Sequence, residues 1–142
     1  MNELAVRIAT AAALLWLGMV LAISFLEAPL KFRAPGLDLR VGLAIGRIVF
    51  RALNLAEIGW AIVIAVALIV DPQSVPVAVA ATVTIALLAV QLGLVRPRLN
   101  RRSDRVLAGE DVPPSSSHHV YITLEVVKVI ALIVLSAWLL SG

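Results

Sequence analysis

The sequence predicts an all-α integral membrane protein: a four-helix bundle with an interfacial amphipathic helix preceding the second membrane span. Of its 142 residues, 61% are hydrophobic and 15% are charged, whereas soluble domains have roughly 45–50% and about 25%. A soluble domain of this length buries only about two-thirds of its surface, so it would expose much of this apolar content to water. No cysteine is present, which excludes a disulfide framework and thiolate metal sites. We expect residues 1–142 to form a single membrane domain.

Four apolar segments are long enough to cross a bilayer, which takes about 20 largely apolar residues for roughly 30 Å of hydrocarbon. The predicted spans cover approximately residues 5–26, 52–70, 75–95 and 120–140. The first is longer than the core of a signal peptide and is closely followed by Lys31, so we expect it to be retained as a true span. The second contains Glu57, and the fourth contains Glu125 and Lys128.

The basic residues are concentrated in the two long connections between spans. Residues 27–51 and residues 96–119 each contain five Lys and Arg residues, so together they hold ten of the twelve in the chain. The connection at residues 71–74 contains none. The positive-inside rule then predicts that both long connections face the cytoplasm and that both termini lie on the non-cytoplasmic side of the cell inner membrane.

The connection at residues 27–51 is expected to contain an amphipathic helix that leads into the second span. Asp38 is a suitable N-cap for it. Arg40, Arg47 and Arg51 then fall within about 40° of each other around a helix of 3.6 residues per turn. Such a helix lies in the interface with its arginines among the phosphates of anionic lipids. Ordinary anchoring is one interpretation, and a specific surface for an anionic lipid or substrate is the other.

Two pairs of small residues at four-residue spacing are candidates for close helix contacts. Gly42 and Gly46 lie in the amphipathic segment, and Gly18 and Ala22 lie in the first span. Small side chains let neighbouring helices approach closely in a membrane. We therefore expect both pairs at interfaces of the bundle, and Gly42 and Gly46 are also a candidate dimer face.

The connection at residues 96–119 is basic at first, then acidic, then rich in Pro and Ser, which indicates a flexible connector. We expect no nucleic-acid partner, because the basic cluster is short and carries no interleaved aromatic residues. His118 and His119 are adjacent, and no carboxylate or cysteine stands at a recognisable metal-ligand spacing from them. No metal site and no other cofactor is therefore predicted.

Each predicted span places a polar or ionisable residue in its cytoplasmic half. The seven residues are Glu27, Asn54, Glu57, Gln91, Tyr121, Glu125 and Lys128. An ionisable side chain within a span costs roughly 2.5–3.5 kcal/mol, so it usually faces protein or water and has a partner. The similar depth predicts one internal cluster in which Lys128 neutralises an acid. Two interpretations stay open: a structural network that sets helix register, and a proton or ion relay or substrate site open to the cytoplasm.

Three segments carry a resemblance to a known family. The first is LWLGMVLAISFLEAPLKF at the end of the first span, the second is GLAIGRIVFRALN before the second span, and the third is HHVYITLEVVKV at the start of the last span. In these segments the chain resembles a small, uncharacterised bacterial family of multi-span membrane proteins, distantly similar to the copper-resistance membrane protein D group. The resemblance implies a membrane fold and location, and it implies no biochemical activity.

The motifs favour a protein that is not an enzyme. No nucleophile and base stand at a recognisable spacing, and no phosphate-binding loop is present. The first functional hypothesis is a non-enzymatic accessory subunit or scaffold, in contact with anionic lipid head groups and assembled as a homo-oligomer or with a membrane-protein partner. The alternative is a small oligomeric transporter or an ion- or proton-coupled carrier that uses Glu57, Glu125 and Lys128. A shared interior cavity at these residues would favour the alternative.

Overall fold

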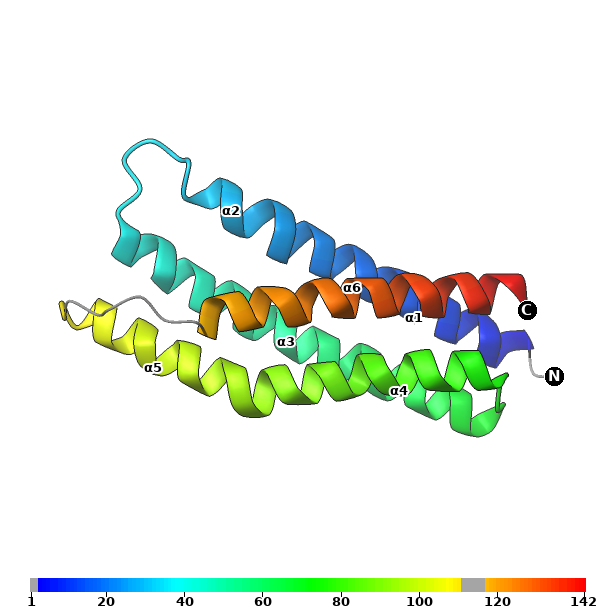
Figure 1. Ribbon diagram of the computed structural model, residues 1–142. Coiled ribbons are helices and arrows are strands. Elements are labelled where there is room, and N and C mark those ends of the chain that lie inside the picture. The colour runs from blue at the N-terminus through cyan, green and yellow to red at the C-terminus, as the bar shows by residue number, and fades with distance from the viewer. Residues whose placement is uncertain (1–2, 111–116) are drawn as a thin grey trace.

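The computed structural model describes residues 3–110 and 117–142, which form four helical passes in one bundle (Figure 1). In chain order the elements are α1 (Glu3–Val20), η1 (Leu21–Glu27), α2 (Ala28–Lys31), α3 (Leu39–Val70), α4 (Val75–Val90), η2 (Gln91–Val95), α5 (Arg96–Leu107) and α6 (Ser117–Ser141). The start of α1, the α3–α4 turn and the end of α6 lie at one end of the bundle, which we call the terminal end. The predicted all-α four-helix bundle is confirmed.

All four passes are long and apolar enough to cross a membrane. Large apolar side chains also cover much of the outer surface: Ile69 and Val70 of α3 and Val75 of α4 are each more than half exposed. Such exposure is unfavourable in water but costs little against lipid tails. The length, composition and outer surface of the passes together fit a multi-pass membrane protein.

Small residues pack the terminal half of the bundle. The buried face of α1 consists of Ala5, Ala9, Ala12, Ala13, Trp16 and Val20. It meets α3 and α6, which contribute Ala61, Ala67 and Leu135 among others. Alanine side chains allow close approach of helices where lipid supplies no hydrophobic driving force. This tight packing sets the rotation of each helix about its axis.

The sequence placed Gly18 and Ala22 at bundle interfaces, and within this chain that prediction is wrong. Both residues are exposed, and no atom lies within 4 Å of a Cβ built at Gly18. The buried face of α1 includes Trp16, and a residue two positions later on a helix is rotated by about 200° around the helix axis. Gly18 therefore points away from the neighbouring helices.

Gly42 and Gly46, by contrast, lie at a close approach. A Cβ at Gly42 would collide with the ring of Phe32, and a Cβ at Gly46 would lie 3.3 Å from Nζ of Lys31. The two glycines therefore let the start of α3 pack against the end of the first pass.

Two wide, π-helical turns interrupt the first and third passes. In each case a proline follows closely: Pro29 comes after η1 and Pro97 comes after η2. Proline has no N–H, and its ring clashes with the carbonyl four residues earlier, which belongs here to Phe25 and Gly93 respectively. A wide turn relieves that clash. Such turns are frequent at functional sites.

The amphipathic helix expected before the second span is not a separate element. It is the first part of α3, which runs unbroken for 32 residues and is about 48 Å long at 1.5 Å per residue. The side chain of Asp38 accepts a hydrogen bond from N of Arg40 at 3.3 Å and so caps the helix as expected. Since the hydrocarbon core is roughly 30 Å thick, α3 extends beyond it.

The connection after the third span was expected to be flexible, and its first half is instead helical. Residues 96–107 form α5, and Gly109 follows in the turn after it with a φ of +88°, which suits glycine. An ion pair between Arg47 and Asp104 holds α5 against α3. The prediction failed because the many charged residues of this segment suggested a solvent-exposed connector. In the structure the segment forms a helix that contacts α3.

Candidate functional site

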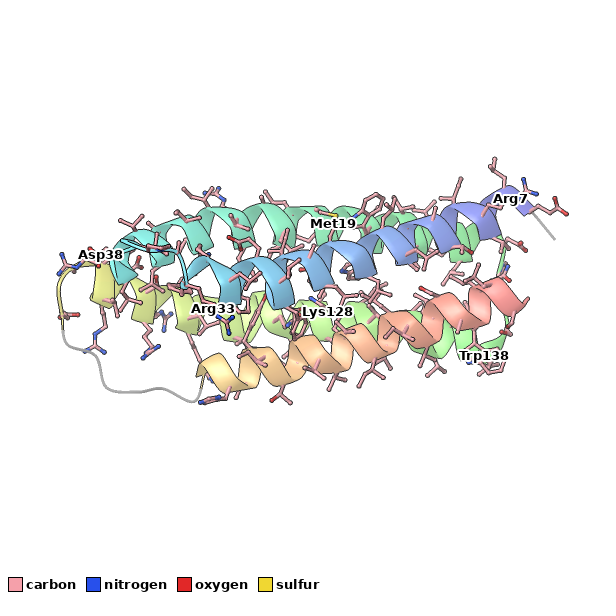
Figure 2. The ribbon with its side chains drawn as sticks, turned by 90° about the horizontal axis from the view of Figure 1, so that it is seen from above. Arg7, Met19, Arg33, Asp38, Lys128 and Trp138 are labelled. Carbon is pink, nitrogen blue, oxygen red and sulfur yellow. The ribbon has the colours of Figure 1, made fainter. Side chains whose placement is uncertain are left out.

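Lys128 lies at the centre of a buried group of polar side chains. It is fully buried and lies near the middle of the bundle (Figure 2). Its Nζ forms ion pairs with Glu57 and, at 2.6 Å, with Oε1 of Glu125. It also donates a hydrogen bond to Oε1 of Gln91 at 2.8 Å. An ammonium group has three donors, so each of its donors has an acceptor.

The first pass completes this group with two further donors. Nε1 of Trp16 donates to Oε1 of Glu57 at 2.9 Å, and Oγ of Ser24 donates to Oε2 of Glu125 at 3.0 Å. All four passes therefore contribute. We call the polar cluster the set Trp16, Ser24, Glu57, Gln91, Glu125 and Lys128.

The charges of the polar cluster do not balance. Two carboxyl groups, those of Glu57 and Glu125, face the single ammonium group of Lys128. In addition, Oε2 of Glu57 is buried and has no hydrogen-bond partner among the described residues. Because an uncompensated charge within a membrane span is costly, the polar cluster has room for one further proton or cation.

The structure brings four of the seven predicted residues into direct contact: Glu57, Gln91, Glu125 and Lys128. Tyr121 is buried one turn before Glu125, and Asn54 is buried one turn before Glu57. Neither forms a hydrogen bond to the polar cluster in the part of the chain that the structure describes.

Glu27 lies outside the polar cluster, contrary to the prediction. It is partly exposed and pairs with Lys31 one turn later, at 3.5 Å. The wide turn of η1 places Ser24 on the inward face instead, so that a serine makes the contact expected of the glutamate. Trp16 was not among the residues predicted for the polar cluster. An indole N–H inside an apolar helix usually needs a buried acceptor, so the position of Trp16 within the first span could have indicated a polar partner.

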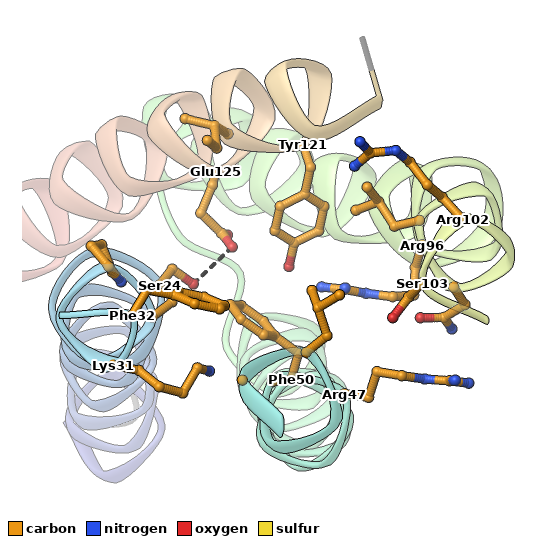
Figure 3. Close-up of a pocket in the computed structure, with 18 of the residues that line it drawn as sticks. Ser24, Lys31, Phe32, Arg47, Phe50, Arg96, Arg102, Ser103, Tyr121 and Glu125 are labelled. Atoms are coloured by element: carbon orange, nitrogen blue, oxygen red, sulfur yellow. Dashed lines mark hydrogen bonds between the residues drawn. The ribbon is translucent and has the colours of Figure 1, made fainter. Parts of the chain in front are cut away.

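A cavity of about 510 Å³ lies beside the polar cluster, in the half of the bundle away from the terminal end (Figure 3). Its polar and charged lining includes Ser24, Lys31, Arg47, Arg96, Arg102, Ser103, Tyr121 and Glu125. The rings of Phe25, Phe32 and Phe50 form much of the apolar wall. Glu125 is thus shared: it belongs to the polar cluster and it lines the cavity.

The three arginines expected to contact lipid phosphates have different surroundings. Arg47 pairs with Asp104 and lines the cavity. Arg40 and Arg51 are exposed. Contact of these residues with anionic lipid stays a prediction.

Comparison with known proteins identifies no relative: no family model, no curated protein and no solved structure matches the chain. The resemblance to the bacterial membrane family therefore stays a prediction. Among residues 3–110 and 117–142, no three His, Cys, Asp or Glu side chains are grouped so as to hold a metal ion, and the side chain of His118 lies outside the described residues.

Proposed function

We propose that the chain is a small, non-enzymatic carrier of the cell membrane in which Glu125 exchanges a proton with the cavity. The observation that carries the proposal is the shared position of Glu125. Its Oε1 contacts Lys128 within the polar cluster, and the same residue lines a cavity of about 510 Å³. A buried acid that is next to a cavity has a path for proton exchange, whereas an acid sealed among helices has none.

The partners of the two acids suggest different roles for them. Glu57 accepts from Trp16 and Lys128, and both of these groups are donors only. Both bonds are to Oε1 of Glu57, while its Oε2 is buried without a partner among the described residues. Glu57 does not line the cavity, so a proton held there has no path for exchange. Oε2 of Glu125 bonds to Ser24, and a hydroxyl group both donates and accepts. That hydrogen bond persists whether Glu125 is ionised or protonated, so Glu125 is the acid suited to exchange.

The orientation of the carrier follows from charge. The cavity lies in the half of the bundle that carries both basic connections, and such connections face the cytoplasm. We therefore infer a cavity open to the cytoplasm, both termini on the non-cytoplasmic side, and the inner membrane as the location. Because four helices enclose little space, we infer that the carrier works as a homo-oligomer.

Infrared spectroscopy of the protein in phosphatidylcholine liposomes tests proton exchange at Glu125. We expect a protonated-carboxyl band whose intensity changes with pH in the wild type and is lost in Glu125→Gln. Glu27→Gln is the matched control, since it removes an acid from the same half of the bundle but outside the polar cluster. The proposal is wrong if Glu125→Gln and the wild type show the same pH-dependent band.

A second candidate is the accessory or scaffold role, and one observation favours it. Lys128 is fully buried with an acceptor for each donor, and such a centre sets the register of the passes without any exchange. In that case Glu125→Gln and the wild type show the same pH-dependent carboxyl absorption, which comes from the exposed acids, while Glu125→Gln still lowers the free energy of unfolding. The same spectra therefore separate the two functions.

A further inference from the structure

The cavity contains buried donor groups that no described residue satisfies. Nε and Nη2 of Arg96, Oγ of Ser103 and the hydroxyl of Tyr121 are all buried without a hydrogen-bond partner in the described part of the chain, as is Nε of Arg102. Tyr121 itself is 94% buried, since only 6% of its surface is exposed. All four residues line the same cavity. Leaving one such donor unsatisfied costs about 1–3 kcal/mol, so their concentration in one place indicates a missing acceptor.

Arg96 is the residue best placed to bind such an acceptor. Figure 3 shows its guanidinium group extending into the cavity, between Tyr121 and Phe50. The guanidinium carbon lies 4.5 Å from the centre of the Tyr121 ring and 5.0 Å from that of Phe50. The two rings meet edge to face, with their planes at 89° to each other, and both attract the guanidinium charge by cation–π contacts. Its N–H groups point outward from the edge, and a guanidinium binds a carboxylate or phosphate through that edge.

Among the described residues, the acids near the cavity do not balance its cations. Glu27 pairs with Lys31, Asp104 pairs with Arg47, and Glu125 pairs with Lys128. Among the described residues, Arg96 and Arg102 have no ion pair. The cavity therefore has an excess of positive charge together with unused donors.

The remaining wall is apolar. Phe25, Phe32 and Phe50 line it together with aliphatic residues such as Leu43 and Ile122. The volume of about 510 Å³ lies within the range of roughly 300–1,000 Å³ that is usual for small-molecule sites. An inorganic anion would leave most of this wall uncovered, so the ligand needs an apolar part.

We infer that the cavity binds an amphiphilic anion. Its carboxylate or phosphate head group is held by Arg96, Ser103 and Tyr121, and its alkyl or aromatic part packs against the phenylalanine rings. The inference names a substrate class for the proposed carrier and rests on that proposal for its role in transport. The anion site and proton exchange at Glu125 are compatible in charge. If a monovalent anion enters the cavity while Glu125 takes up one proton, the net charge of the site does not change.

Equilibrium binding to the full chain in neutral maltoside micelles tests the site without any transport. The probe is hexyl phosphate, measured by isothermal titration calorimetry beside inorganic phosphate and hexanol. We expect hexyl phosphate to bind more tightly than either fragment. We expect Arg96→Gln to weaken its binding by at least about tenfold, which corresponds to about 1.4 kcal/mol. Tyr121→Phe keeps the ring against Arg96 but removes the hydroxyl, so a smaller loss is expected there.

Arg98→Gln is the matched control, because Arg98 is an exposed arginine of the same helix that does not line the cavity. It should bind hexyl phosphate as the wild type does. Equal affinity in Arg96→Gln and the wild type would overturn the site, and so would equal losses in Arg96→Gln and Arg98→Gln. Hexyl phosphate that binds no more tightly than inorganic phosphate would exclude an amphiphile.

The source of the anion is decided by competition. Phosphatidylglycerol added to the micelles displaces hexyl phosphate if the occupant is a lipid head group, and it leaves the affinity unchanged if the occupant is a soluble anion. Either result supports an anion site at Arg96. Failure of this binding test leaves the infrared test of Glu125 valid, and failure of the infrared test leaves the binding site valid, so the two proposals fail separately.

Discussion

At the scale of single residues, Lys128 determines how two acids are tolerated in the interior of a membrane bundle. Its ammonium group contacts Glu57, Glu125 and Gln91, so it compensates charge and satisfies hydrogen bonds from three passes at once. Removal of one partner from a buried ion pair leaves an uncompensated charge, which costs more than the pair itself contributes to stability. Lys128 is therefore expected to be the most sensitive position of the polar cluster.

Lys128→Met should lower the free energy of unfolding by about 3–5 kcal/mol, the usual cost of breaking a buried pair. Denaturant titration in micelles measures this change. Arg7→Met is the control, because it removes a cation whose pair with Glu3 is exposed, and exposed pairs contribute little. Adding Glu57→Gln to Lys128→Met should recover part of the loss, since one buried charge disappears. Equal, small effects of Lys128→Met and Arg7→Met would contradict the central role of the lysine.

At the scale of elements, the two wide turns link proline positions to the site. η1 contains Ser24, and η2 begins at Gln91, so each wide turn contributes one side chain to the polar cluster. η2 also determines the direction of α5, which carries Arg96 at its first position and Ser103 further along. A local requirement of Pro29 and Pro97 thus positions residues of both the polar cluster and the cavity.

Pro97→Ala should weaken hexyl phosphate binding without unfolding the bundle. Restoring the N–H allows η2 to return to a regular α-helix, which rotates Arg96 by about 100°, the angle of one helical residue. Calorimetry should then show a loss similar to that of Arg96→Gln. Pro76→Ala serves as the control, because Pro76 lies in the first turn of α4 where no wide turn precedes it. Unchanged binding in Pro97→Ala would show that the wide turn is not needed to position the binding site.

At the scale of the whole molecule, the bundle has two halves of different character. Alanines pack the terminal half closely. The other half contains the polar cluster, the cavity and the extended ends of α3 and α5. The difference follows from the side chains, since alanines permit close packing, whereas phenylalanine and arginine side chains enclose the cavity in the other half.

The orientation of the molecule is testable at its C-terminus. We expect alkaline phosphatase fused after Gly142 to be active and a green fluorescent protein fused there to be dark, because the C-terminus is predicted to lie on the non-cytoplasmic side. Fusions in the connection around residues 111–116 should behave in the opposite way. A fluorescent C-terminal fusion would reverse the orientation and would place the cavity on the other side of the membrane.

Much of the site was predictable because a bilayer penalises charge. Glu57, Glu125 and Lys128 stand out in apolar spans, and the cost of an unpaired charge there requires them to meet. The contribution of the first pass was not predictable in the same way. Glu27 was the nearest acid, yet the wide turn of η1 directs Ser24 inward and leaves Glu27 with Lys31.

The residues that line the cavity were likewise not predictable as a site from the sequence. Arg96 and Ser103 come from α5, a segment expected to be a flexible connector, and Tyr121 comes from α6. Their chemistry as separate residues is ordinary. Only their convergence, with donors left unsatisfied, indicates a ligand.

The local pattern of apolar and charged residues was enough to predict the four apolar helices, the two basic connections and the charged residues within the spans. A bilayer restricts the length and the composition of each segment that crosses it, so these features can be read from the sequence. Tertiary packing decided which polar faces meet and that Glu125 borders a cavity. The rotation of each helix depends on contacts between residues far apart in the chain, such as Trp16 with Glu57 and Ser24 with Glu125. Such contacts leave no periodic signal within one helix, and so they emerge only when the four passes are assembled.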